Sequence, residues 1–177
     1  MTAGRSGLAL GLALTVLGAP PAEAALGDTY LRFEKSLLLQ GDRLFRYEGR
    51  QGARFRFGPA RGCTIGNPLL LVDVQDGLIV QQVLVLPLPR RERDMPRLEH
   101  VVGLFLQDAG LDAEARRVAA RTFTETCRSG KGTRKPLGPE ARWMLDTVAS
   151  PALGQVVLAV GFRPTALAPG SQQERGS

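Results

Sequence analysis

The sequence predicts one α+β domain, an antiparallel sheet of about five to six strands with two to three helices packed on one face. Residues 43–57 alternate between apolar and polar side chains, and residues 69–86 form two apolar runs around a turn. Residues 98–127 instead repeat apolar side chains every three to four positions. Strands followed by helices and a last strand are typical of α+β folds.

The first 24 residues have the pattern of a secretory signal. Arg5 is followed by an apolar run from Leu8 to Leu17 and by the small-residue cleavage pattern Ala22-Glu23-Ala24. A run of about ten apolar residues is half of what a bilayer core requires, so no membrane span is predicted. We expect a periplasmic or extracellular protein with one domain over residues 25–163 and a disordered polar tail over residues 164–177.

The first strands are predicted from side-chain parity. Arg43 to Glu48 and Ala53 to Phe57 alternate, with the turn between them at residues 49–52. One parity collects aromatic residues and the other collects arginines. The aromatic side chains that should face the core are Phe45, Tyr47, Phe55 and Phe57. Residues 29–39 fit a strand and a helix capped by Asp28 equally well, so both alternatives stay open.

A β-hairpin is predicted over residues 69–86. Asp76-Gly77 is a preferred pair for a two-residue hairpin turn, and it lies between two runs rich in leucine and β-branched residues. Regular pairing around this turn places Val72 opposite Gln81 and Leu70 opposite Val83 on the core side.

Helices are predicted in the second half of the chain. Leu98 to Leu106 has helical spacing and ends before Gly110, and Asp112 can cap a second helix. Ala115, Ala119, Phe123 and Cys127 form the apolar stripe of that second helix. A third helix is predicted over residues 139–148, and a last strand over residues 155–162.

Export suggests a disulfide between the two cysteines. Oxidising compartments favour disulfides, so we expect Cys63 and Cys127 to be joined, which would tie the sheet half to the helical half. The alternative is two unpaired cysteines, one on a loop and one in the core. Two cysteines and a single histidine lack the paired spacing of zinc sites, so no metal is expected.

Basic residues gather in two segments of a chain whose net charge is +6. Residues 43–61 contain six arginines and one glutamate, and residues 128–135 contain four basic residues and no acid. A disulfide would bring the segments together as an anion-binding surface. Its expected members are Arg46, Arg54, Arg56, Arg61, Arg128, Lys131, Arg134 and Lys135. The alternative is that these side chains are only the solvated side of the strands.

Catalytic motifs are scarce in this sequence. His100, the only histidine, is expected on a helix surface beside Glu99, so no Ser-His-Asp triad is predicted. Asp73 lies in an apolar strand run, where it is either a buried acid of a hydrolase or a solvent-side residue paired with an arginine. Ser129 to Thr133 lacks the spacing of a phosphate loop, so a flexible polar loop and no cofactor are expected.

The leading hypothesis is therefore an exported binding or assembly module that is not an enzyme. Its expected partner is an anionic envelope component, such as a lipid headgroup or an acidic polymer, or an acidic protein, and no nucleic acid. Two alternatives are an exported hydrolase with carboxylates around Asp73 and an accessory protein that docks through a hairpin face containing Leu71, Val80 and Leu84.

Overall fold

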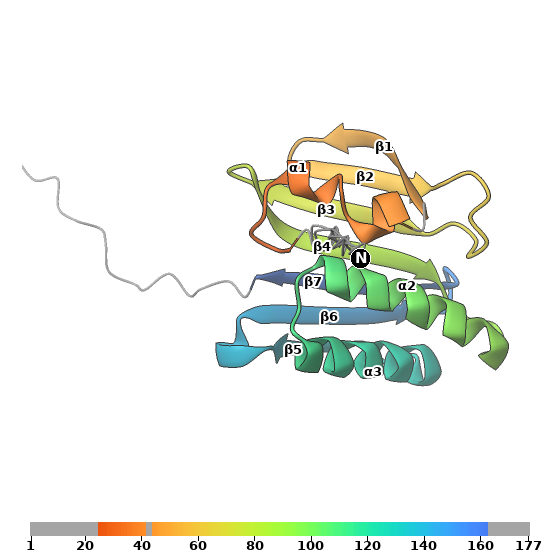
Figure 1. Cartoon of the computed structure of the whole chain (residues 1–177). Coiled ribbons are helices and arrows are strands. Elements are labelled where there is room, and N and C mark those ends of the chain that lie inside the picture. The colour runs from red at the N-terminus through yellow and green to blue at the C-terminus, as the bar shows by residue number, and fades with distance from the viewer. Residues whose placement is uncertain (1–24, 42–43, 163–177) are drawn as a thin grey trace, which may run out of the picture.

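The structure, a computed structural model, describes residues 25–41 and 44–162. The expected signal, Arg43 and the expected polar tail lie outside these residues. Within them, seven strands form one antiparallel sheet in the order β1-β2-β3-β4-β7-β6-β5 (Figure 1). The strands are β1 (Phe45–Gln51), β2 (Arg54–Pro59), β3 (Leu69–Gln75), β4 (Leu78–Pro87), β5 (Thr133–Leu137), β6 (Trp143–Ser150) and β7 (Gln155–Phe162).

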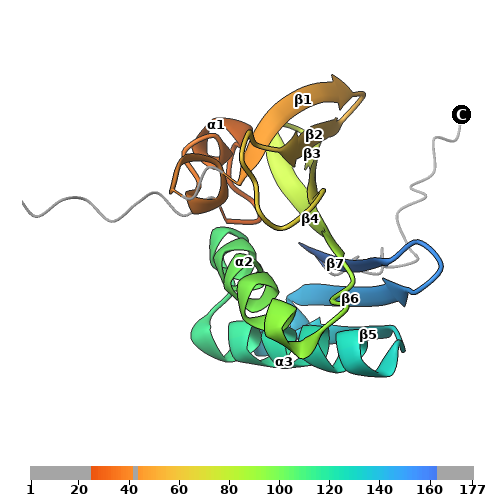
Figure 2. The ribbon, with the colours of Figure 1, turned by 90° about the vertical axis from the view of Figure 1, so that its right-hand side faces the viewer.

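The helices lie on one face of this bent sheet, and the hydrophobic core fills the space between them (Figure 2). The helices are α1 (Tyr30–Phe33), α2 (Met95–Asp108) and α3 (Ala113–Ser129). Among the described residues, three short turns accompany them, the π-helical turn η1 (Leu37–Gly41) and the 3-10 turns η2 (Glu92–Asp94) and η3 (Pro139–Ala141), the last of which connects β5 to β6. The predicted α+β class is confirmed, with slightly more strands than expected.

Two of the strands, β5 and β6, were not predicted from the sequence. The expected third helix over residues 139–148 is wrong, because only the short turn η3 follows Pro139 and β6 begins at Trp143. Trp143, Leu145 and Thr147 are buried in strict alternation, the period of a strand. The expected loop over residues 129–133 runs into β5, which pairs with β6.

Residues 29–39 adopt the helical alternative. Helix α1 buries Phe33, and η1 buries Leu38. The expected cap is wrong, since Thr29 holds the N-cap position. Asp28 instead accepts hydrogen bonds from the backbone N–H of Ala25 and from the guanidinium of Arg32.

The predicted hairpin is confirmed, but its register differs from the regular one. Asp76 and Gly77 both have positive φ angles, 51° and 79°, as a type I′ turn requires. The pairing shifts by one residue between Asp73 and Val74, a bulge that leaves Val80 as the extra residue. The core side therefore carries Gln82 and Leu84, which are both fully buried, in place of Gln81 and Val83.

The two long helices agree closely with the helices predicted from the sequence. Helix α2 ends at Asp108, and Gly110 takes the left-handed conformation with a φ of 74°. The Asp112 side chain accepts a hydrogen bond of 2.8 Å from the backbone N–H of Ala115 and so caps α3. The predicted stripe on α3 is buried at Ala115, Ala119 and Phe123 and half-buried at Cys127.

Candidate functional site

The basic residues expected to bind anions do not form one surface. Strand β2 lies next to one edge of the sheet, and β5 forms the opposite edge (Figure 1). Five strand-to-strand steps separate them, which at about 4.8 Å per step is about 24 Å along the sheet. The sheet order thus keeps Arg54 and Arg56 apart from Arg134 and Lys135.

Four of the expected anion ligands are already paired with carboxylates. These pairs are Arg54–Asp73 at 2.6 Å, Arg56–Glu48 at 3.0 Å, Arg128–Glu92 at 3.3 Å and Arg134–Asp146 at 3.6 Å. Among the described residues, Arg46, Arg61, Lys131 and Lys135 have no such pair. They lie on β1, on the β2–β3 loop, just before β5 and on β5, so they do not form a cluster either.

The predicted disulfide is not present in the structure, where Cys63 and Cys127 are both free thiols. Cys63 lies in the turn after β2, where its backbone N–H donates to the carbonyl of Ala60 at 3.1 Å. Cys127 shares a small cavity with Met95 and with residues 89–92 of the connection into α2, and Cys63 does not line that cavity. The helical stripe thus directs Cys127 toward the start of α2.

Burial makes Cys127 a slow nucleophile. Burial, with a smaller contribution from the charge of Glu99, raises the pKa of the Cys127 thiol to about 11. Since only the thiolate reacts, about one thiol in 1,000 is reactive at pH 8. We expect folded Cys63→Ser protein to react with a thiol reagent at least about 100-fold more slowly than free cysteine, and about tenfold faster with each pH unit between 8 and 10.

The control for this experiment is the Cys127→Ser variant, which leaves only Cys63. Unfolded wild-type protein prepared without reductant should titrate two thiols. A titre near zero, or a Cys127 rate at pH 8 equal to that of free cysteine, would contradict the prediction.

The two candidate catalytic residues are arranged as ordinary surface residues. Both carboxylate oxygens of Asp73 accept hydrogen bonds from Arg54, at 2.6 and 2.8 Å, so Asp73 is held in an ion pair. The Arg54 pKa is raised further by this hydrogen bond and by the Asp73 charge. His100 is exposed on α2, as expected. Neither arrangement supports a general acid in a buried site.

The hairpin face proposed for docking has a different composition from the expected one. Leu84 is fully buried against the core, whereas the register places Leu71 and Val80, which are half-buried, on the sheet face opposite the helices. The register places Leu71 beside Val83 and Val83 beside Ala159, so an apolar band crosses the centre of this face.

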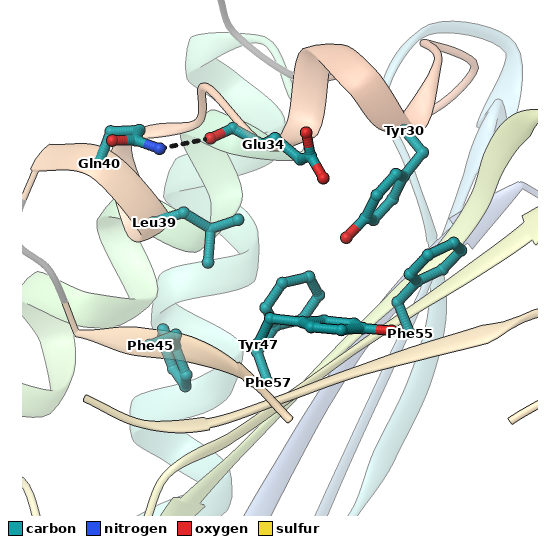
Figure 3. A pocket seen from close by; sticks show the side chains of 8 residues that line it. All are labelled: Tyr30, Glu34, Leu39, Gln40, Phe45, Tyr47, Phe55 and Phe57. Atoms are coloured by element: carbon teal, nitrogen blue, oxygen red, sulfur yellow. Dashed lines mark hydrogen bonds between the residues drawn. The ribbon is translucent and has the colours of Figure 1, made fainter. Parts of the chain in front are cut away.

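A different site lies between the first helical segment and the first two strands. Figure 3 shows a pocket with the side chains of α1 and η1 on one side and those of β1 and β2 on the other. Its volume is about 530 Å³. The residues that line it are Tyr30, Glu34, Leu39, Gln40, Phe45, Tyr47, Phe55 and Phe57.

Aromatic rings form most of this pocket. Phe45 and Phe57 are 4% and 2% exposed and form its base, whereas Tyr47 is 55% exposed and stands at its opening. The Tyr30 ring stacks on Phe55 with centroids 3.8 Å apart, and the Tyr47 ring meets Phe57 edge to face at 5.7 Å. These contacts hold the rings around the cavity.

Apart from the Tyr47 phenol on β1, the polar groups of the pocket come from the helical side. Glu34 and Gln40 are exposed at its rim, and the Gln40 amide donates a 2.9 Å hydrogen bond to the backbone carbonyl of Glu34. Partial burial, with smaller contributions from the charges of Glu34 and Tyr47, raises the pKa of Tyr30 to about 12. Tyr30 therefore keeps its proton at neutral pH and can donate a hydrogen bond into the cavity (Figure 3).

Sequence reasoning found the aromatic residues of this pocket but not the pocket. The shared parity of Phe45, Tyr47, Phe55 and Phe57 placed them on one face and assigned them to the core. Only the position of α1 and η1 over that face shows that space remains between the two layers. The signal that could have suggested it is an excess of aromatic residues at the very start of the sheet.

Comparisons with known proteins give no family for this chain, since it matches no protein-family model, no curated protein and no solved structure. Within residues 25–41 and 44–162, no helix has the length and apolarity needed to cross a bilayer. The same residues contain no group of three or more histidine, cysteine, aspartate or glutamate side chains that could hold a metal ion.

Proposed function

We propose that this chain is a small-molecule-binding module without catalytic activity, and that its ligand site is the aromatic pocket. The observation that supports this proposal is the convergence of five aromatic rings, from α1, β1 and β2, on one cavity of about 530 Å³. Pockets that bind small molecules have volumes of about 300–1,000 Å³ and apolar, aromatic walls with a few polar groups. Tyr30, Glu34 and Gln40 supply such polar groups here.

The chemistry of the lining favours binding over catalysis. Its described residues include a single carboxylate and two phenols, without a second acid, a histidine or a cysteine to form a nucleophile and base pair. None of the described lining residues is basic, so the ligand we propose is not the anionic envelope component that the charge pattern suggested. We also propose that the module works outside the cytoplasm, and the signal-like residues 1–24 support this.

Binding of a neutral fluorescent probe tests the site. We expect N-phenyl-1-naphthylamine to bind saturably with increased fluorescence, because its two aromatic groups suit an apolar cavity of this size. Gln40→Trp places a large side chain at the rim and should weaken binding at least about tenfold. Leu153→Trp is the matched control, since Leu153 is 71% exposed in the turn between β6 and β7.

The two tryptophan variants separate the pocket from other apolar surfaces. Equal probe binding by the wild type, Gln40→Trp and Leu153→Trp would show that the probe lies elsewhere and would contradict the proposal. A thermal unfolding curve for each variant checks that both remain folded.

A further inference from the structure

The charge of the pocket is opposite to that of the protein. The chain has a net charge of +6, yet among the described residues that line the pocket Glu34 is the only charged one. Among the described residues Glu34 forms no ion pair, so its carboxylate at the rim is available to a ligand. A carboxylate at the entrance favours a cationic ligand over a neutral or anionic one.

The rings beneath that carboxylate also favour a cation. Aromatic faces carry negative charge density and attract cations within about 6 Å of the ring centroid. The protein already uses one ring of this cluster in that way, because the Arg50 guanidinium lies 4.9 Å from the centroid of Phe55. Arg50 itself does not line the cavity.

The base of the pocket determines which kind of cation fits. Phe45 and Phe57 offer no hydrogen-bond acceptor, so a primary ammonium buried there would leave its N–H groups unpaired at a large cost. A methylated ammonium has few or no N–H groups and presents apolar methyl surface to the rings. A metal ion would need several oxygen, nitrogen or sulfur ligands, and the part of the lining that the structure describes has one carboxylate.

We infer that the pocket binds a quaternary or methylated ammonium group, with the methyl groups against Tyr47 and Phe57 and the positive charge facing Glu34. This inference rests on the proposed function, since it requires the pocket to be a ligand site. The group can belong to a free solute or to a phosphocholine lipid headgroup, which present the same chemistry.

Calorimetry with choline and its neutral isostere 3,3-dimethyl-1-butanol tests the charge directly. The two molecules have nearly the same shape, so any preference for choline reports the cation. We expect choline to bind at least about tenfold more tightly, and tetramethylammonium to compete with it. Equal affinity for the two isosteres would overturn the inference while leaving the pocket a small-molecule site.

Two charge-neutralising variants identify the residue responsible. Glu34→Gln should weaken choline binding about fivefold or more without changing binding of the neutral isostere. The matched control is Glu125→Gln, an exposed carboxylate on α3 with the same change of charge. Equal choline affinity in both variants would contradict the role of Glu34 and with it the proposed orientation.

Vesicles distinguish the two sources of the ligand. Sedimentation with phosphatidylcholine vesicles, but not with phosphatidylglycerol vesicles, and release by tetramethylammonium would assign the group to a lipid headgroup. Choline binding without vesicle binding would assign it to a free solute. If neither choline nor vesicles bind while N-phenyl-1-naphthylamine does, the cation inference fails and the proposed function stands; if the probe also fails, both are wrong.

Discussion

Replacing Asp108 with alanine is expected to lower the free energy of unfolding by about 4 kcal/mol, because one buried and one partly buried backbone donor lose their acceptor. Asp108 is 0% exposed at the end of α2, and its two carboxylate oxygens accept hydrogen bonds from the backbone N–H groups of Leu37 at 3.1 Å and Leu38 at 2.9 Å. This contact joins residues about 70 positions apart and fastens η1 to α2.

Chemical denaturation of Asp108→Ala and Asp108→Asn measures this contribution. Asparagine keeps one acceptor oxygen in place, so we expect about half the loss that alanine causes. Glu125→Ala, on the exposed side of α3, is the control and should change the free energy of unfolding by less than about 0.5 kcal/mol. A loss below about 1 kcal/mol for Asp108→Ala would show that η1 is held by other contacts.

The same variant links stability to the proposed site. Turn η1 carries Leu39 and Gln40, which line the aromatic pocket. If Asp108 holds η1 in place, Asp108→Ala protein that remains folded should bind N-phenyl-1-naphthylamine more weakly than the wild type. Unchanged probe affinity would mean that the pocket does not depend on this contact.

Two leucines of one hairpin should differ strongly in their contribution to stability. Leu84 is 0% exposed against the helices, whereas Leu71 is half-buried on the uncovered face of the sheet. Leu84→Ala is expected to lower the free energy of unfolding by about 3 kcal/mol, because a fully buried leucine leaves a cavity. Leu71→Ala removes the same atoms from a partly solvated position and should lower it by about 1 kcal/mol.

This pair of variants tests the hairpin register, since each leucine is the other's matched control. The regular register would place both leucines on the outer face and predicts similar losses for the two variants. Urea unfolding of both variants under identical conditions decides between the two registers, provided that the slope of each transition matches that of the wild type.

The hairpin illustrates what local sequence can predict here. Asp76-Gly77 specifies a tight turn through the backbone conformations that these two residues allow, and the turn forms as predicted. The bulge at Val80 does not follow from such a preference, because it depends on how β3 and β4 pack together against the core. A shift of one residue then exchanges the faces of every residue beyond it.

The wrong helix prediction over residues 139–148 also arose because local spacing does not report long-range pairing. Met144, Leu145 and Val148 fit one side of a helix as well as they fit a short strand, so spacing alone does not choose between them. Pairing of Trp143–Ser150 with β5 and β7 on its two sides favours the strand. Such non-local pairing is not visible in a short window of sequence.

The candidate site likewise combines a feature that local sequence predicts with one that it does not predict. The parity of Phe45, Tyr47, Phe55 and Phe57 followed from alternation along two neighbouring strands, because successive strand residues point to opposite faces. The covering segment could not be placed in this way, since its position depends on the buried contact between Asp108 and η1 across about 70 residues.

Chain-local preferences therefore account for the α+β class, the hairpin turn, the ends of the two long helices and the aromatic face of the first strands. Long-range packing accounts for the strand order, the bulge, the separation of the two basic segments and the open space beneath α1. The physical reason is that turns, caps and alternation depend on neighbouring residues, whereas register, strand order and cavities depend on contacts between segments far apart in the chain.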